Sequence, residues 1–400
     1  MSQIHVLVIN CGSSSVKFSI VDTASGQAVL TGLAERLLSA KASFKLNYRQ
    51  QSEHFSLNAP YDHQAAVAEL VQQLTRLELI DSISAVGHRV VHGGEKFSQP
   101  TLITAKVKAT INELAHLAPL HNPANLTGIE AAEKALEHLP QVAVFDTAFH
   151  QSMPEKAYLY GLPYELYQEH AIRRYGFHGS SHAFVAGQAA DFIGKPLSQC
   201  SFISAHLGNG CSITAVKGGQ SIDSSMGFTP LEGVMMGSRS GDLDPGIIFH
   251  LIDHLGYSPD EVQQLLNKKS GLLGLSGLSN DCRELEQAAF EENNTRAKLA
   301  LEIFCYRIAK YIAALSASLT SLDGLIFTGG IGENSSYVRE QILNQLSLLN
   351  FHIDQDKNRD TRFGKSDDIS TPSSRYALVI PTNEEGVIAS QSYQVLQEAK

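Results

Sequence analysis

The feature that most constrains the fold is a strand, turn and strand motif that occurs twice. Residues 4–9 are a mostly apolar, β-branched run, residues 10–15 (NCGSSS) are small and hydrogen-bonding, and residues 16–21 alternate as a second strand. The same order recurs at residues 201–216, where LGNGCS separates two strand-like runs. We interpret the pair as an internal duplication, one copy near the start of each half of the chain. So short a similarity can also arise by coincidence.

The tip of the first hairpin offers groups that suit a phosphate. Backbone N–H groups, the Asn10 amide, the hydroxyls of Ser13 and Ser15 and the Lys17 ammonium would all lie at or near this tip. An ordinary Gly/Ser turn explains the same residues equally well. The motif alone therefore leaves both interpretations open.

Length and composition restrict the class of protein. A chain of 400 residues predicts two domains, and a formal net charge of −10 argues against a nucleic-acid partner. No apolar run approaches the roughly 20 residues that a membrane span needs, and the N-terminus lacks the features of an export signal. The five cysteines have no metal-ligand spacing, as expected for reduced thiols in a cytoplasmic protein.

Strand and helix patterns alternate along the chain, which predicts an α/β fold. Several antiparallel strands are predicted within residues 27–56, and single strands at 83–86, 141–145, 324–327 and 377–380. Helices are predicted at 61–79, 107–118, 126–136, 259–266, 296–319 and from about 386. Residues 119–125 are predicted as a turn, and residues 224–245 form a long Gly-rich loop of the kind that is more often functional than connective.

Glycine-rich turns follow three of the predicted strands, at residues 10–15, 208–212 and 329–333. Glycine lets the backbone approach a phosphate closely, and a helix that begins after Gly-Gly favours an anion. The chain contains no P-loop motif, and the dinucleotide signature is missing in the required setting between strand and helix. Together, the three turns predict a nucleotide-binding site that uses neither of these two motifs.

Two arginines and two histidines are candidates for anion binding. Arg89 and Arg239 are predicted to lie in Gly-rich loops, where a guanidinium can bind carboxylate or phosphate oxygens, although each could also form a surface ion pair. His121 and His178 are loop histidines beside apolar residues, a setting in which a structural role is more common. Spacing does not rank the remaining candidates, which are His88, His92, His150, His182 and His206.

Two carboxylates follow apolar strands directly. Asp146 and Glu384 could hold Mg²⁺ beside a nucleotide, or they could cap the helices that follow. A zinc site has little support, because no His-Glu-x-x-His motif or Cys/His pairing occurs.

Nine motifs together resemble the acetate kinase family, in the family's order from residue 9 to residue 385. They are INCGSSSVKF, GHRVVHGGE, APLHNPAN, VFDTAFH, RRYGFHGSSH, HLGNG, SMGFTPLEGVMMGSRSGDLDP, FTGGIGEN and PTNEE. The resemblance implies two duplicated ribonuclease-H-like (actin-like ATPase) domains with a nucleotide cleft between them. We expect residues 1–150 with 385–400 to form the first domain and residues 151–384 the second.

The resemblance also implies an activity. It is the reversible transfer of phosphate from ATP to acetate, giving acetyl phosphate and ADP, in a cytoplasmic homodimer that uses Mg²⁺, for which Mn²⁺ can substitute. The close alternative is propionate kinase or another short-chain acyl kinase of the same family. A chaperone or filament protein of the same superfamily is a further alternative. Such proteins need an appended peptide-binding region or a polymer interface, and we expect no such further domain after the last helix.

The family's site residues map onto this sequence by motif. Asp146, His178, Arg239 and His121 would be catalytic, and Asn10 and Glu384 would support the metal. Glu384, not Glu385, is chosen by the family pattern alone. The substrate would contact Arg89 and a small apolar pocket of Val91, Leu120, Phe177 and Pro230. The nucleotide would contact Lys17, Ser13, Ser15, His206, Leu207, Gly208, Asn209, Gly210, Asp281, Cys282, Arg283, Gly329, Gly330, Ile331, Gly332 and Glu333.

Elementary chemistry adds one expectation, and the family pattern implies the others. A carboxylic acid with a pKa of roughly 4–5 is ionised at neutral pH, so the nucleophile needs no general base and Asp146 should orient the metal or an arginine. Val91 stands where propionate kinases commonly have alanine, which favours acetate. Two positions depart from the family pattern: Cys211 should slightly crowd a phosphate turn, and Gly386 should loosen the start of the last helix.

Overall fold

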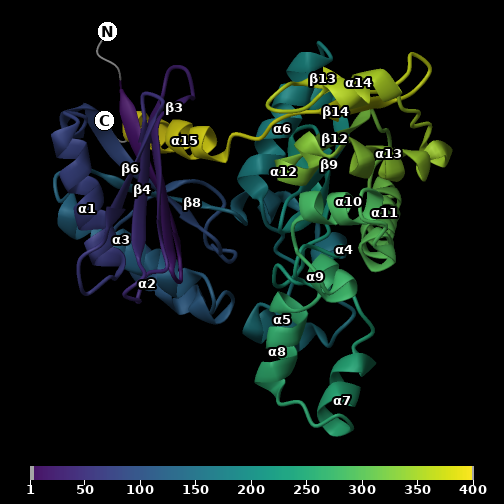
Figure 1. Ribbon diagram of the computed structural model, residues 1–400, viewed down its shortest axis with the longest axis horizontal. Coiled ribbons are helices and arrows are strands. Elements are labelled where there is room, and N and C mark those ends of the chain that lie inside the picture. The colour runs from purple at the N-terminus through teal and green to yellow at the C-terminus, as the bar shows by residue number, and fades with distance from the viewer. Residues whose placement is uncertain (1–3, 399–400) are drawn as a thin grey trace. The chain divides into compact units, whose positions relative to one another are not determined.

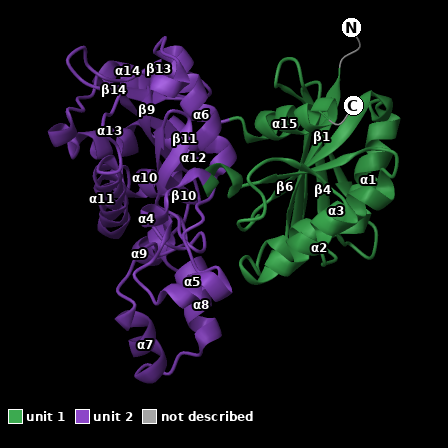
Figure 2. Cartoon of the chain, turned by 180° about the vertical axis from the view of Figure 1, so that it is seen from behind, with its two compact units in different colours: residues 1–151, 383–400 green, residues 152–382 purple. Residues whose placement is uncertain are grey.

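The computed structural model describes residues 4–398. The chain forms two compact units, one of residues 1–151 with 383–400 and the other of residues 152–382 (Figure 2). We call them unit 1 and unit 2 and describe each by itself.

Unit 1 is built on an eight-stranded sheet with the order β5-β4-β3-β2-β1-β6-β8-β7. Strands β1 to β5 form an antiparallel meander, whereas β6 and β8 run parallel to β1 and β7 closes the edge antiparallel to β8. The strands are β1 (His5–Gly12), β2 (Ser15–Asp22), β3 (Ala28–Glu35), β4 (Ser43–Tyr48), β5 (Gln51–Ser56), β6 (Ile83–Val90), β7 (Thr101–Leu102) and β8 (Gln141–Phe145).

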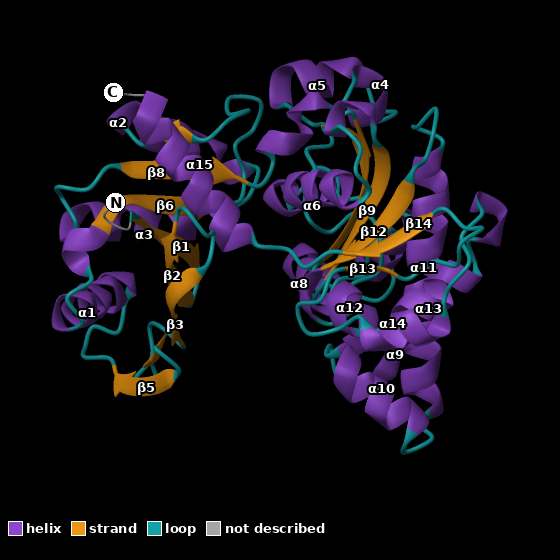
Figure 3. Ribbon diagram, turned by 90° about the horizontal axis from the view of Figure 1, so that it is seen from above, coloured by secondary structure: helices purple, strands orange, loops and turns teal. Residues whose placement is uncertain are grey.

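Strand β1 is apolar on both faces because helices cover both sides of the sheet. Leu7 and Ile9 pack in the core that contains residues of α1 (His63–Arg76) and α3 (Asn122–Ala135). Val6 and Val8 point the other way, toward Ile388 of α15 (Glu384–Glu398). The C-terminal helix therefore completes the layer on the second face (Figure 3). Helix α2 (Ala105–Glu113) packs against α3.

Unit 2 repeats the central arrangement of unit 1. Its sheet has the order β11-β10-β9-β12-β14-β13, with β9 and β10 as an antiparallel hairpin and β12 and β14 parallel to β9. The strands are β9 (Ser201–Leu207), β10 (Cys211–Lys217), β11 (Gln220–Ser224), β12 (Gly324–Thr328), β13 (Asp367–Asp368) and β14 (Tyr376–Val379). The order β11-β10-β9-β12-β14 matches β3-β2-β1-β6-β8, so both predicted hairpins are confirmed and the duplication extends over five strands.

Several helices of unit 2 lie around this sheet, whereas α5, α7 and α8 lie away from it (Figure 1). Three helices, α6, α11 and α12, pack against β9. No helix or strand lies between β11 and α7, as predicted for the loop at 224–245. The helices are α4 (Glu155–Tyr158), α5 (Tyr164–His170), α6 (Gly179–Phe192), α7 (Gly246–Asp253), α8 (Pro259–Lys268), α9 (Gly271–Ser276), α10 (Cys282–Phe290), α11 (Thr295–Ser316), α12 (Gly329–Asn334), α13 (Ser336–Asn344) and α14 (Gln355–Asp360).

The structure corrects four element boundaries. Strand β6 continues to Val90, so Arg89 lies in a strand and not in a loop. Gly87 does not end this strand, because it is the residue that lets α15 pack closely: a Cβ there would lie 2.5 Å from the Ser392 hydroxyl oxygen. Helix α3 begins inside the predicted turn, with proline in its first turn, and α11 ends at Ser316, which leaves Leu319 outside it.

The fourth correction concerns the start of α15. The helix begins at Glu384, and the Asn383 side chain caps it by accepting a hydrogen bond of 3.0 Å from the Gly386 N–H. A Cβ on Gly386 would lie 2.3 Å from the Asn383 amide nitrogen, which donates to the Gly26 carbonyl. Gly386 therefore makes room for the cap and does not loosen the helix.

Within residues 4–398, none of the helices combines the length and the apolar character needed to cross a bilayer.

Candidate active site

In unit 1, the ends of two neighbouring strands bring Arg89 and Asp146 together. Arg89 lies near the end of β6 and Asp146 directly follows β8. The guanidinium donates two hydrogen bonds to the carboxylate, from Nε to Oδ1 at 2.9 Å and from Nη2 to Oδ2 at 2.7 Å. Such a paired geometry is strong and fixes the plane of the guanidinium. Asp146 therefore orients an arginine in this structure.

Charge and burial both act on this pair. The negative charge of Asp146 raises the pKa of Arg89 above its usual value. Burial raises the pKa of the Asp146 carboxyl, and the charge and hydrogen bonds of Arg89 act in the opposite direction. Glu384 is close enough to act electrostatically on both residues. Two carboxylates and one arginine thus share a small region of unit 1.

The two glutamates at the start of α15 differ in their partners. Glu385 forms an ion pair of 2.7 Å with Lys17, whose side chain is largely exposed. Within residues 4–398, the Glu384 carboxylate makes no side-chain hydrogen bond or ion pair, so it remains available. Asn10 lies in β1 directly opposite Lys17 of β2, and the exposed Ser13 lies at the hairpin tip with Ser15 just after it.

Two asparagines of the APLHNPAN motif connect these segments, a role that the sequence reasoning missed. Asn125 accepts a hydrogen bond from the Val91 N–H at 3.0 Å and donates one to the Cys11 carbonyl at 2.8 Å. Asn122 accepts from the His92 N–H at 3.1 Å and donates to the His92 carbonyl at 3.0 Å. The motif therefore fixes the backbone around Val91 relative to the first hairpin.

The other proposed substrate-pocket residues are divided between the units. Val91 is buried and Leu120 is 51% exposed in unit 1, with His121 at the N-cap position of α3. Phe177 is buried in unit 2, where the Pro230 carbonyl accepts a hydrogen bond of 3.3 Å from Arg239.

In unit 2, Arg239 and His178 converge on the LGNG turn. A Cβ built on Gly210 would lie 3.4 Å from Arg239 Nη1 and 3.6 Å from His178 Nε2. His178 has a left-handed backbone conformation (φ 57°) at the start of α6, which is uncommon for a residue other than glycine and occurs preferentially at functional sites. His206 stacks on His178, with ring centroids 4.3 Å apart. The missing side chain of Gly210 thus leaves room for a group that could contact both donors.

Burial and backbone contacts position Arg239. Burial lowers the pKa of Arg239, although an arginine still remains charged at neutral pH. Its loop is held by Arg174, which forms a 2.6 Å ion pair with Glu232 and donates to the Ser224 carbonyl at 2.7 Å. Gly227 is required next to this pair, because a Cβ there would lie 1.5 Å from a Glu232 oxygen.

A pocket of about 570 Å³ in unit 2 collects residues from three of the segments that were expected to bind nucleotide, and none from the first hairpin. The predicted residues in its lining are Gly208, Asn209, Asp281, Cys282, Arg283, Gly330 and Ile331. The lining also includes residues that the sequence reasoning missed: Asn280, Glu286, Asn334, Ser335, Arg362 and Phe363. This volume lies within the range of small-molecule sites.

Other residues expected to contact the nucleotide lie outside this lining: Ser13, Ser15 and Lys17 of the first hairpin, and His206, Leu207, Gly210, Gly329, Gly332 and Glu333. The Glu333 carboxylate accepts hydrogen bonds from the N–H groups of Gly329, at 2.9 Å, and Thr382, at 3.1 Å. The buried Arg339 donates to the carbonyls of Gly332 and Glu333. The side chains of Glu333 and Arg339 thus fix the backbone of the Gly-Gly turn through hydrogen bonds.

Comparison with known proteins agrees with these features. Residues 5–390 match the acetokinase family. The chain is 54% identical over 398 residues to the acetate kinase of Shewanella sp. (strain ANA-3), which covers 99% of this chain and 100% of that protein.

The chain belongs to the acetokinase family. It is therefore an enzyme, a kinase. Solved structures agree with this assignment: the acetate kinase of Porphyromonas gingivalis has a TM-score of 0.93 and 43% identity, and the propionate kinase of Francisella tularensis has a TM-score of 0.93 and 44% identity. Each comparison covers 98% of this chain and 100% of the other. The expected α/β fold of two duplicated, actin-like ATPase domains is confirmed.

The first departure from the family pattern, Cys211, does not crowd the turn. Its side chain is fully buried and its thiol contacts the Gly208 carbonyl at 3.1 Å. Burial raises the pKa of the Cys211 thiol to about 12, so the group is neutral at physiological pH. The exposed side of the LGNG turn remains clear.

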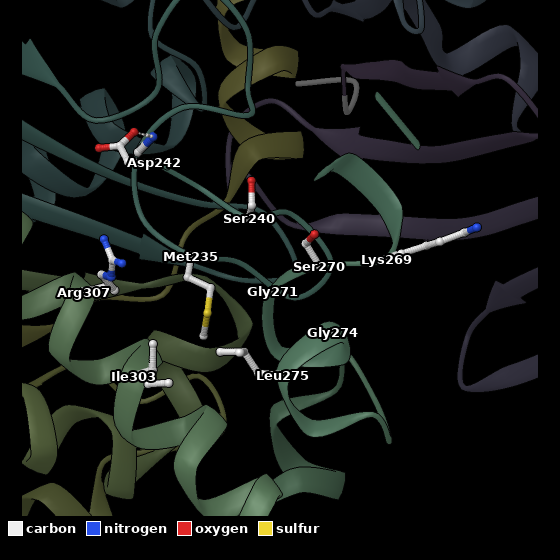
Figure 4. Close-up of a pocket in the computed structure, with 11 residues that line it drawn as sticks. Met235, Ser240, Asp242, Lys269, Ser270, Gly271, Gly274, Leu275, Ile303 and Arg307 are labelled. Atoms are coloured by element: carbon white, nitrogen blue, oxygen red, sulfur yellow. Dashed lines mark hydrogen bonds between the residues drawn. The ribbon is translucent and has the colours of Figure 1, made fainter. Parts of the chain in front are cut away.

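A second cavity of about 460 Å³ lies beside the segment that carries Arg239 (Figure 4). Met235, Leu275 and Ile303 form its apolar part, and Asp242 and Arg307 lie at one side. None of the residues expected to be functional lines this cavity.

Proposed function

We propose that this enzyme phosphorylates acetate with ATP, giving acetyl phosphate and ADP, and catalyses the reverse reaction. The observation that carries the proposal is the convergence of Arg239 and His178 at the LGNG turn, which also lines the nucleotide-sized pocket. Similarity to acetate kinases over the full chain supports the choice of reaction.

Direct in-line transfer needs positioned donors more than covalent help from the protein. The acetate carboxylate attacks the γ-phosphorus, and the bond from that phosphorus to the bridging oxygen of ADP breaks. Arg239 and His178 donate hydrogen bonds to the phosphoryl oxygens as their charge is redistributed. Arg89 binds the substrate carboxylate, and Asp146 holds the guanidinium in the required plane. Because acetate is already ionised, no residue removes a proton from it.

The residues near Asp146 also suit Mg²⁺. This ion prefers oxygen ligands and takes few of them from the protein, because water and phosphate oxygens supply the rest. Glu384 offers a carboxylate without a protein partner in the described chain, and the Asn10 side chain offers an amide oxygen. When bound, Mg²⁺ would neutralise charge on the nucleotide phosphates. Within residues 4–398, no three His, Cys, Asp or Glu side chains are grouped for metal binding, so an all-protein cage is not proposed.

Acetate is favoured over propionate, the substrate named for the Francisella tularensis relative. Val91 supplies two methyl groups to a pocket in which one methylene is worth about 1–3 kcal/mol. The test is acyl phosphate formation trapped with hydroxylamine, with acetate and propionate each as acceptor. A higher kcat/KM for acetate is expected. A higher value for propionate would assign the alternative, and no acyl phosphate from any short acid would exclude both and favour a non-catalytic member of the superfamily.

We also propose that the enzyme is a cytoplasmic homodimer. Helix α7 has no buried residue, although its sequence GIIFHLID is largely apolar, and Phe249 is 64% exposed. An apolar helix in this state suits an interface with a second copy. All five cysteines are free and buried, which suits a reducing compartment. Light scattering after size-exclusion chromatography should give twice the mass of one chain, and Phe249→Asp should give one chain's mass. An unchanged mass for the variant would place the interface elsewhere, and a single-chain mass for the wild type would refute the dimer.

We further propose that the two compact units are the two domains of the enzyme. Residues 1–151 with 383–400 would form the first and residues 152–382 the second.

A further inference from the structure

Three buried side chains form a hydrogen-bonded chain that ends on His178. Ser204 Oγ lies 2.9 Å from His182 Nδ1, and His182 Nε2 lies 2.7 Å from Ser212 Oγ. Ser212 Oγ lies 2.8 Å from His178 Nδ1. Ser204, His182 and Ser212 are each fully buried.

The chain can carry its hydrogen bonds in one of two directions. A serine hydroxyl has one proton, so Ser212 must donate to one histidine and accept from the other. If Ser212 donates to His178 Nδ1, then His178 carries its own proton on Nε2. If the direction is reversed, the proton of a neutral His178 lies on Nδ1 and Nε2 has only a lone pair.

Ser204 decides the direction. Its hydroxyl contacts His182 alone within the described chain, so in the reversed direction its proton would have no acceptor. An unsatisfied buried donor costs roughly 1–3 kcal/mol. In the forward direction Ser204 donates to His182, His182 donates from Nε2 to Ser212, and Ser212 donates to His178. The forward direction satisfies every donor in the chain.

We infer that Ser204, His182 and Ser212 are positioning residues that fix His178 as the tautomer protonated on Nε2. That nitrogen faces the same side of the turn as Arg239, because both lie within 3.6 Å of a Cβ built on Gly210. The inference rests on the proposed role of His178 as a donor to the transferred phosphoryl group. A neutral imidazole protonated on the other nitrogen would present a lone pair there and repel the phosphoryl oxygens.

The test combines the tautomer of His178 with steady-state kinetics. In protein labelled with ¹⁵N-histidine and assigned with His178→Gln, the ¹⁵N chemical shifts should show the His178 proton on Nε2. Ser212→Ala and Ser204→Ala should give a mixed or reversed tautomer and lower kcat for acetyl phosphate formation roughly 10- to 100-fold. The KM values for ATP and acetate should stay within about threefold. Ser212→Thr, which keeps a hydroxyl, should restore both measurements.

Ser224→Ala is the matched control, because Ser224 is buried in the same sheet and its hydroxyl contacts Thr214 and no histidine. It should leave both measurements unchanged. Ser204→Ala keeps the inference falsifiable if Ser212→Ala does not fold, because Ser204 does not contact His178.

Three results would overturn the inference: a wild-type proton on Nδ1, a loss of kcat without a change of tautomer, or a change of tautomer without a loss of kcat. If the wild type makes no acetyl phosphate, the proposed function fails, and the wild-type tautomer still decides whether the chain sets His178.

Discussion

Asp146 holds Arg89 by two parallel hydrogen bonds of 2.9 and 2.7 Å, so the carboxylate is used to orient a cation. Asp146→Asn keeps the shape but removes the charge and one acceptor. We expect kcat/KM for acetate to fall about 100-fold, by analogy with lost transition-state contacts. The pH profile of kcat/KM should keep its shape, because Asp146 takes no proton. Glu133→Gln, which removes the Lys108–Glu133 ion pair of unit 1, should have little effect. Loss of the limb at low pH in Asp146→Asn would instead identify Asp146 as a general base.

Arg239 should act on the transferred phosphoryl group and not on the bound nucleotide. Arg239→Ala is expected to lower kcat by roughly 10²- to 10³-fold, because one donor to developing charge is worth about 3–4 kcal/mol. The Kd for ATP, measured by titration calorimetry, should change by less than about threefold. Arg307→Ala removes an exposed arginine outside the nucleotide pocket and serves as the control. An equal loss of ATP affinity in Arg239→Ala would mean that its role is ground-state binding.

A substitution at Gly330 can test whether the pocket binds nucleotide without lowering the stability of the protein. A Cβ there would meet no atom of the protein within 4 Å, yet Gly330 lines the pocket. Gly330→Val should therefore raise the Kd for ATP about tenfold or more by filling space, with an unchanged melting temperature. Gly187→Val is matched, because Gly187 also lies in a helix and has the same free space, but is outside the pocket. If Gly330→Val binds ATP with the wild-type Kd, the nucleotide does not bind in this pocket.

Burial of His88 should make unit 1 less stable in acid. Burial lowers the pKa of His88 to about 4, and its ring lies 2.7 Å from the Gln141 side-chain oxygen. The unfolded chain, with a histidine pKa of about 6.5, binds this proton at higher pH than the folded chain does. The free energy of unfolding should thus fall as pH decreases from about 6.5 to about 4, by up to roughly 3 kcal/mol from this residue.

Urea unfolding followed by circular dichroism between pH 7 and pH 4 measures this effect. His88→Gln keeps an N–H donor that does not titrate, so its unfolding should depend less on pH in this range. An identical pH dependence in both proteins would show that His88 does not contribute to it.

The two hairpins and helix α11 could be predicted, because the spacing of apolar residues within each segment is enough to identify it. Arg89 was predicted to lie in a loop because a glycine such as Gly87 often ends a strand. In the structure Gly87 instead makes room for α15, and this contact joins segments about 300 residues apart, which no local pattern reveals. Phe363 and Arg362 of the nucleotide pocket follow α14 in a stretch without periodicity, and only the tertiary fold brings them near Gly330. The family motifs pointed to His178 and Arg239, and the structure places both side chains beside Gly210. Ser212 could not be predicted, because a serine in a buried strand gives no sign of its partners.

The central claim is that an acetate carboxylate oxygen attacks the transferred phosphorus and becomes the bridging oxygen of acetyl phosphate. The most direct measurement is ³¹P NMR of a reaction containing this enzyme, ATP, Mg²⁺ and acetate labelled with ¹⁸O in both carboxylate oxygens. We predict an acetyl phosphate resonance with the isotope shift of one ¹⁸O bonded to phosphorus. No acetyl phosphate, or acetyl phosphate without ¹⁸O on phosphorus, would contradict it.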